Sequence, residues 1–164
     1  MATPDFILGL RKHVGHDLLW LTGVTAVVVA DSGEVLLHRR ADDGNWSTPG
    51  GILEPGEQPA AALVREVAEE TGVAVVPERI ASVVTEPPFT YPNGDQVQFI
   101  DITFRCRAVG GRARADGEES LEVAWFSRDA LPPMNGRVLR RIRHAHDEGP
   151  AYYVAPHEDG PLPG

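Results

Sequence analysis

The stretch "PGGILEPGEQPAAALVREVAEETGV", residues 49–73, places the strongest constraint on the fold. From Gln58 to Thr71 its apolar residues recur at intervals of three and four, which predicts one amphipathic α-helix. Gly72 then follows as a residue that can end the helix in the left-handed conformation. The apolar stripe expected to pack on a sheet is Ala60, Leu63, Val64, Val67, Ala68 and Thr71. The chain is therefore expected to build its domain around this helix.

Another arc of the same helix is acidic near its C-terminus. At about 100° per residue, Glu66, Glu69 and Glu70 fall within an arc of about 100°. Each carboxylate there opposes the helix macrodipole at a cost of roughly 0.3–1 kcal/mol. Arg65 can reach Glu69 at i+4, but one cation cannot neutralise three anions. A bound divalent cation would remove the conflict, whereas the alternative is a solvated acidic helix face.

The type of cation follows from the ligands. Oxygen ligands without Cys or His favour Mg²⁺, or Mn²⁺ as a substitute, over zinc. The turn before the helix supports the metal hypothesis, because Gly50 and Gly51 let a backbone carbonyl point at an ion. Glu57 lies at or just before the helix start, where its charge suits the dipole.

The remaining chain predicts strands on both sides of this helix. Residues 24–30 and 34–40 form a hairpin through an Asp-Ser-Gly turn, and an Asn-Gly turn at 93–94 predicts a second hairpin. Segments 73–84, 96–109 and 121–127 are strand-like, and residues 137–147 predict a final helix. This order indicates an α+β layered domain around a mixed sheet.

The length of 164 residues, 42% of them hydrophobic, suits one domain. We expect that domain over residues 1–154, with 155–164 as a flexible tail. Residues 1–20 form an N-terminal helical extension that could cap the domain or contribute to a homodimer contact.

Composition excludes several classes of function. With a net charge of −9 and scattered basic residues, a nucleic-acid polymer is not an expected partner. Cys106 is the only cysteine, which excludes an intrachain disulfide and a thiolate zinc site, and we expect it buried and inert in a strand. The most apolar stretch, residues 18–30, is shorter than the roughly 20 residues that span a bilayer. Without a secretory-type start, the expectation is a cytoplasmic protein with no membrane contact.

The spacing of the glutamate-rich stretch resembles a known signature. Gly51, five residues, Glu57, seven residues and then "REVAEETGV" match every fixed position of the Nudix hydrolase box. The flanks "NWSTPGG" and "EVAWFSRDALP" also look like those of the family, so the resemblance covers about residues 23–131.

That resemblance implies an α/β/α sandwich around a mixed sheet and Mg²⁺-dependent hydrolysis of a pyrophosphate bond in a nucleoside diphosphate linked to a group X. It implies Glu66, Glu69 and Glu70 as metal ligands, completed by the carbonyl of Gly50. Glu57 and Arg65 would pair and orient these ligands, and Glu66 or Glu70 could accept a proton.

Some family members take their general base from a loop outside the box. The candidates here are Glu118, Glu119 and Glu122, for which an exposed loop position is the alternative.

Other side chains are candidates for contact with the substrate, each with a structural alternative. Arg39 and Arg40 could bind a phosphate or face solvent. Trp46 could stack on a base but is expected to anchor its loop. Phe89 and Tyr91 could stack on a nucleobase or pair across the second hairpin. The late helix carries Arg137, Arg140, Arg141 and Arg143, which are expected to form a solvated basic face, and His144 and His146, which do not share a helical face.

Several functions remain open at this point. ADP-ribose or sugar nucleotides are the first substrate class, and (d)NTPs of the nucleotide-sanitising type are the second. A binding module that senses a nucleotide without hydrolysis is a third hypothesis, and an acidic interaction domain is a fourth. The complete set of box glutamates favours an active enzyme.

Overall fold

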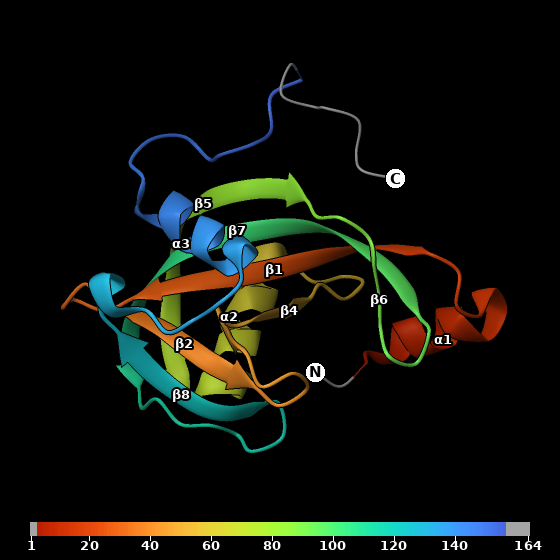
Figure 1. The fold of residues 1–164 in the computed structure, drawn as a ribbon, viewed down its shortest axis with the longest axis horizontal. Helices are drawn as coiled ribbons and strands as arrows, with labels where there is room; N and C mark the ends of the chain where they lie inside the picture. Colours follow the sequence, from red (N-terminus) through yellow and green to blue (C-terminus); the bar gives the residue numbers. More distant parts are fainter. Residues whose placement is uncertain (1–2, 157–164) are drawn as a thin grey trace.

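β1 (Leu19–Val29) is the central strand of the computed structural model, which describes residues 3–156 (Figure 1). It pairs in parallel with β7 (Gln96–Gly111) on one side. On its other side it pairs antiparallel with β2 (Val35–Arg40) and β4 (Gly50–Ile52). The sheet is therefore mixed, as predicted. The remaining strands are β3 (Trp46–Ser47) and β8 (Ser120–Phe126), which pair with β2, and β5 (Val73–Thr85) and β6 (Phe89–Thr90), which pair with β7.

Helices cover both faces of this sheet (Figure 1). α2 (Pro59–Thr71) packs on one face, and α3 (Gly136–His146) packs on the other. A short 3₁₀ helix, η1 (Arg128–Ala130), comes before α3, and α1 (Asp5–Val14) lies at one end of the molecule. The predicted α/β/α sandwich is confirmed.

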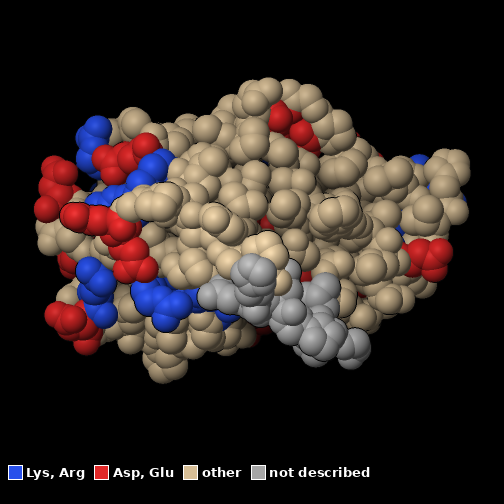
Figure 2. All heavy atoms as spheres, turned by 90° about the horizontal axis from the view of Figure 1, so that it is seen from above, with Lys and Arg blue, Asp and Glu red and all other residues tan. Residues whose placement is uncertain are grey.

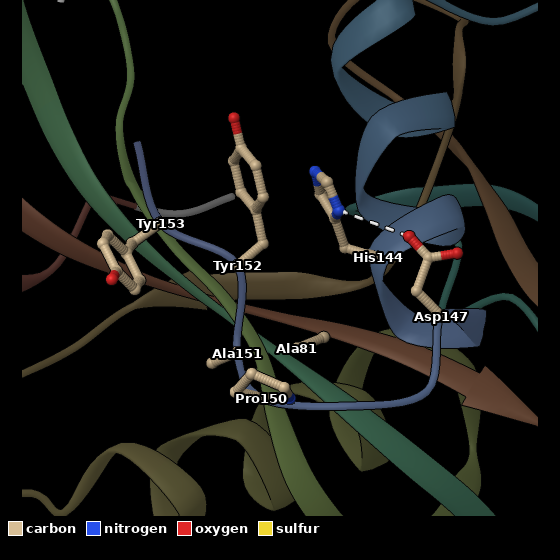
Figure 3. A pocket seen from close by; sticks show the side chains of 7 residues that line it. All are labelled: Ala81, His144, Asp147, Pro150, Ala151, Tyr152 and Tyr153. Atoms are coloured by element: carbon tan, nitrogen blue, oxygen red, sulfur yellow. Dashed lines mark ion pairs between the residues drawn. The ribbon is translucent and has the colours of Figure 1, made fainter. Parts of the chain in front are cut away.

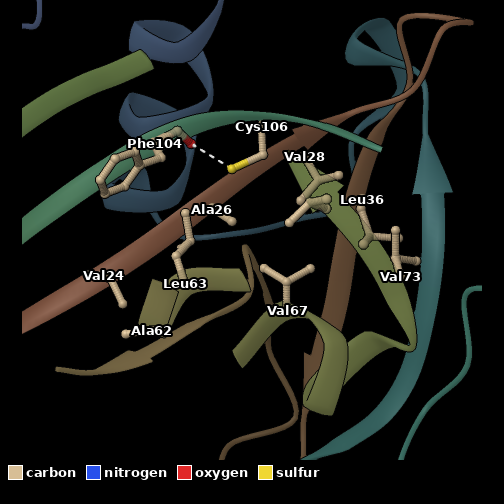
Figure 4. Close-up of a cluster of buried hydrophobic side chains, with 11 residues drawn as sticks. Val24, Ala26, Val28, Leu36, Ala62, Leu63, Val67, Val73, Phe104 and Cys106 are labelled. Carbon is tan, nitrogen blue, oxygen red and sulfur yellow. Dashed lines mark hydrogen bonds between the residues drawn. The ribbon is translucent and has the colours of Figure 1, made fainter. Parts of the chain in front are cut away.

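The sequence of β1 explains why both faces are covered. Successive strand side chains point to opposite faces, and here both sets are apolar, which is typical of a strand buried on both sides. On the α2 side the buried cluster includes Val24, Ala26 and Val28 from β1 with Ala62, Leu63 and Val67 from α2 (Figure 4). On the α3 side the cluster includes Val27 and Val29 from β1 with Val138, Ile142 and Ala145 from α3.

The predicted helix is confirmed, but its buried face is rotated from the expected stripe. α2 begins at Pro59 and ends at Thr71, and it is capped by Gly72, whose φ of 70° lies in the left-handed region. Ala68 is exposed, whereas Glu66 and Glu70 are only 8% and 3% exposed. This burial contradicts the alternative of a solvated acidic helix face, because two of the three carboxylates are buried in the protein.

The N-terminal helix caps the domain. Ile7 is buried in a cluster with Leu21, Ile52 and Val97. The Arg11 guanidinium donates to the carbonyl of Gln96 at 2.8 Å, which ties α1 to β7. Residues 1–2 and 157–164, which include most of the predicted tail, lie outside the described residues.

Both predicted hairpins are present. Val29 is paired with Val35, and Phe89 is paired with Val97. The segment between β2 and α2 contains the short strands β3 and β4. The expected final helix is α3, one residue earlier at each end.

The surface shown in Figure 2 carries acidic and basic side chains intermixed at one end and mostly neither elsewhere. It offers no continuous basic surface of the kind that binds a nucleic-acid backbone. Within residues 3–156, no helix has the length and apolar character needed to cross a bilayer.

Gly50 is predicted to be required for the packing of β4 on β1. A Cβ atom at this position would overlap the Val24 carbonyl oxygen and lie 2.9 Å from the Thr25 Cα. Gly50→Ala should lower the free energy of unfolding by about 1–3 kcal/mol, measured by chemical denaturation. Gly9→Ala is the matched control, because a Cβ atom at Gly9 would meet nothing within 4 Å and α1 should gain stability. Equal stability of the Gly50→Ala variant and the wild type would contradict this packing.

Candidate active site

A cavity of about 450 Å³ lies beside the glutamate-rich helix. Side chains from α1, the central strands, the β6–β7 hairpin and α3 line it, and Glu70 reaches it from α2. It also touches the backbone of Gly50 and Gly51. The cavity therefore joins the predicted metal end of the box to residues that lie far away in the sequence.

Glu70 is the buried carboxylate at the box end of this cavity. Its Oε2 accepts a hydrogen bond from the Gly50 N–H at 3.0 Å. Burial, with smaller contributions from the nearby carboxylates of Glu66 and Glu119, raises the pKa of Glu70 to about 8, against the effect of the Gly50 hydrogen bond. A carboxylate held in this way requires either a proton or a cation.

Arg65 organises three other box carboxylates. Its guanidinium donates to both oxygens of Glu57, at 3.0 and 3.1 Å. It also donates to Glu66 and Glu69, each at 3.1 Å. The Glu57 hydrogen bond raises the pKa of Arg65 and lowers that of Glu57. The expected Glu57–Arg65 pair is therefore present, and Arg65 also restrains two of the predicted metal ligands.

Glu66 lies between the buried Glu70 and the Arg65 guanidinium. Burial raises the pKa of its carboxyl group, whereas Arg65 lowers it and the carboxylates of Glu69 and Glu119 raise it. A Cβ atom on Gly51 would overlap the Glu66 side chain, so glycine at this position lets the Glu66 carboxylate lie directly against the strand.

Glu119 is the loop candidate that the structure brings to the box. It lines the cavity, and it contributes to the raised pKa of both Glu66 and Glu70. Glu122 lies across the β2–β8 pairing from Arg39 and forms an ion pair with it at 3.5 Å. Glu118 is exposed and does not line the cavity.

The donor set fits a hard divalent cation. Carboxylate oxygens are concentrated here, the buried ones are destabilised as anions, and Gly50–Gly51 provides backbone at close range. In the described part of the chain, however, no three His, Cys, Asp or Glu side chains already converge as a metal group. Arg65 holds Glu66 and Glu69, and Gly50 holds Glu70. Ligation by all three glutamates and by the Gly50 carbonyl therefore stays a prediction.

A buried network that the sequence analysis missed lies on the α3 side of the cavity. Asp101 accepts hydrogen bonds from Thr25 at 2.7 Å and from Thr103 at 2.8 Å. Arg141 pairs with it at 3.0 Å, and Glu86 accepts from Arg140 at 3.2 Å. The sequence signal was an acidic residue at a buried position of an otherwise apolar strand. The prediction that the late-helix arginines form a solvated face was therefore wrong for Arg140 and Arg141, since both pair with buried acids.

His38 is a second residue of the cavity that sequence reasoning did not identify. It is buried, and its Nδ1 lies 2.8 Å from the Ser120 Oγ. Burial, with a smaller contribution from the charge of Arg40, lowers the pKa of His38 to about 4, so the imidazole is neutral at pH 7.

The predicted substrate contacts divide into two groups. Arg40, Phe89 and Tyr91 line the cavity, with the two aromatic rings 4.7 Å apart. Arg39 and Trp46 do not line it. Trp46 instead packs edge-to-face on Phe126 at 4.9 Å, which supports its role as a loop anchor.

A separate pocket of about 330 Å³ lies between β5 and the C-terminal segment (Figure 3). His144 stacks on Tyr152 there at 4.0 Å and faces Asp147 at 3.7 Å. No box residue lines this pocket. Cys106 is buried in the core, where burial raises the pKa of its thiol to about 12.

Comparison with known proteins identifies the class. Residues 20–146 match the family model of the NUDIX domain, so the chain belongs to the Nudix hydrolase family, a family of pyrophosphohydrolases. It is 39% identical over 136 residues to a MutT-like protein of Streptomyces ambofaciens, with 82% of each chain covered.

Two further relatives extend this finding. Over 135 residues the chain is 36% identical to the Homo sapiens 8-oxo-dGDP phosphatase NUDT18, covering 79% of this chain and 37% of that one. The crystal structure of a MutT NUDIX hydrolase from Burkholderia pseudomallei superposes with a TM-score of 0.65 at 26% identity, covering 77% of this chain and 98% of that one.

Without metal, Glu70 should make the protein less stable as pH rises. Because its pKa is raised in the folded state, the stability it contributes is complete below its ordinary value of 4.5 and is lost as pH rises through about 8. Glu70→Gln removes this loss. In a chelating buffer the variant should have a higher Tm than the wild type at pH 8.5, and the difference should shrink toward pH 5.

The comparison of the wild type with Glu70→Gln isolates the effect of the Glu70 carboxyl group. Other titrating groups such as His38 are present in both proteins and affect both Tm profiles equally. Melting curves recorded by circular dichroism between pH 5 and 8.5 provide the measurement. Parallel Tm profiles for the two proteins would contradict the assignment.

Proposed function

We propose that this protein is a Mg²⁺-dependent pyrophosphohydrolase that cleaves a nucleoside diphosphate linked to X, of the ADP-ribose or sugar-nucleotide type. The observation that carries this proposal is Glu70, a carboxylate 3% exposed that lines the cavity beside Gly50. The raised pKa of Glu70 reflects an environment that a cation would compensate.

The box residues have distinct roles in this proposal. Glu66, Glu69 and Glu70, with the Gly50 carbonyl, hold the metal. When bound, Mg²⁺ supplies charge neutralisation for the diphosphate and lowers the pKa of the attacking water. Arg65, fixed by both oxygens of Glu57, sets the positions of Glu66 and Glu69.

Glu119 is the proton acceptor that we favour over the box glutamates. It reaches the cavity from the loop before β8, on which Asp116 accepts the N–H groups of Glu118, Glu119 and Ser120 at 2.9–3.0 Å. Those hydrogen bonds fix the backbone that carries the Glu119 side chain. Because Glu66 and Glu70 serve as ligands, a separate carboxylate is left to accept the proton of water.

The nucleoside end of the substrate is assigned to Phe89 and Tyr91. Both line the cavity, and aromatic rings stack on nucleobases. The same cavity is large enough to accommodate a ligand.

A second substrate class is an oxidised guanine nucleotide. The human relative is named an 8-oxo-dGDP phosphatase, and that substrate is itself a nucleoside diphosphate. A non-hydrolysing sensor module is less consistent with this chain, because all the box glutamates and Arg65 are present.

The test is hydrolysis of ADP-ribose, a UDP-sugar, 8-oxo-dGDP and 8-oxo-dGTP with Mg²⁺. Hydrolysis is measured as phosphate release, with a coupling phosphatase where the product does not itself release phosphate. We expect turnover of a nucleoside diphosphate derivative. Glu70→Gln should reduce kcat by at least about 100-fold, which corresponds to the several kcal/mol that metal ligation contributes. Glu119→Gln should reduce kcat by about 100-fold or more with little change in KM.

Glu148→Gln is the matched control, since Glu148 is exposed and lies outside the cavity. Full activity of Glu70→Gln would reject the metal assignment. Wild-type protein that hydrolyses no member of the panel would favour the sensor module instead.

A further inference from the structure

Charged side chains near the α3 end of the cavity occur in pairs. Arg141 contacts Asp101 at 3.0 Å, and Arg140 contacts Glu86 at 3.2 Å. Asp101 is 5% exposed and Glu86 is 4% exposed, so these pairs are largely removed from water. Each acid here therefore has its counter-charge within the protein.

Arg40 is similarly occupied on the neighbouring wall. Its guanidinium donates two hydrogen bonds to Asp42, one of them at 2.9 Å from Nε. That pair raises the pKa of Arg40.

Arg137 differs from these arginines. It stands in the first turn of α3, is part-buried and lines the cavity. Among residues 3–156 no hydrogen bond or ion pair involves its guanidinium. Burial lowers the pKa of Arg137, and the charges of Arg141 and Arg40 lower it further, against the opposite effect of Glu86 and Asp101.

The nearby acids are not available to Arg137. Asp101 already accepts from Thr25 and Thr103 as well as from Arg141. Glu86 accepts from Arg140 with both carboxylate oxygens. A part-buried cation without a partner raises the free energy of the folded protein. Because the Arg137 guanidinium has already lost part of its hydration on folding, an anionic ligand would bind to it at a smaller desolvation cost.

We propose that Arg137 binds a phosphate group of the nucleotide substrate, from the opposite face of the sheet to α2. The fork of N–H donors in a guanidinium matches phosphate oxygens in geometry and in charge. The identity of the anion as a nucleotide phosphate rests on the function proposed above. Arg137 thus adds affinity that depends on the phosphate and not on the base.

The orientation of α3 supplies a matched control. Arg137 and Arg141 are four residues apart, so they share a helical face, and both line the cavity. Arg143 on the same helix is exposed and lies outside the cavity.

The experiment is calorimetric binding of ADP and adenosine, and of GDP and guanosine, in Mg²⁺ buffer with hydrolysis monitored in parallel. Arg137→Gln should weaken binding of both diphosphates by at least about tenfold, the effect of losing a charge-assisted hydrogen bond. Nucleoside binding should change less than about twofold. Arg137→Lys should restore part of the diphosphate affinity, and Arg143→Gln should match the wild type. The Tm of Arg137→Gln should not fall, because no partner within the described chain is lost.

Unchanged ADP affinity in Arg137→Gln would overturn the proposal. So would an equal loss for nucleosides and diphosphates, a loss confined to guanine compounds, or wild-type protein that binds ADP no more tightly than adenosine. A selective loss of diphosphate affinity in a protein that hydrolyses nothing would support the phosphate site while rejecting the proposed hydrolysis.

Discussion

The contact between the Gly50–Gly51 backbone and the carboxylates of α2 is the constraint on which the site depends. The Gly50 N–H donates to Glu70, and Gly51 leaves space that a Cβ would take from Glu66. β4 reaches this position because Gly50 also packs directly on β1. One pair of glycines therefore joins the sheet, the helix and the cavity.

This arrangement concentrates negative charge where water is scarce. Burial and repulsion from neighbouring carboxylates raise the pKa values of Glu66 and Glu70, and Arg65 compensates only part of that charge. On the other side of the cavity the balance is reversed, since the acids are paired and Arg137 has no partner among the described residues. The cavity thus has uncompensated negative charge at one end, which favours a cation, and uncompensated positive charge at the other, which favours an anion. A metal-bound nucleotide diphosphate has both charges.

The sequence predicted the fold well because its signals are local. Apolar periodicity and Gly72 predicted α2, and the order of strand-like and helical segments indicated a layered α+β domain around a mixed sheet. The box spacing identified the family, which the match over residues 20–146 confirms. Burial was harder to predict, because the helical periodicity placed Glu66 and Glu70 on one arc but did not show whether that arc faces solvent. Their actual environment depends on how closely β4 approaches.

Contacts between segments that are distant in the sequence were the other feature that could not be predicted from it. Asp101 and Arg141 are 40 residues apart and meet only through the packing of α3 on the sheet. The arginine pattern of α3 therefore looked like a solvated face, although Arg137 and Arg141 line the cavity. Glu119 could be nominated from sequence but could not be separated from Glu118 and Glu122 until the loop was placed.

The most direct test of the central claim, that the box carboxylates are held for a divalent cation, is an NMR titration of the Glu70 side-chain carboxyl with and without Mg²⁺. In the metal-free protein we predict a pKa of about 8, far above the ordinary value of 4.5. With saturating Mg²⁺ the carboxyl should stay ionised down to or below its ordinary range, because the cation stabilises the anion. A Glu70 pKa that is the same with and without Mg²⁺ would contradict this claim.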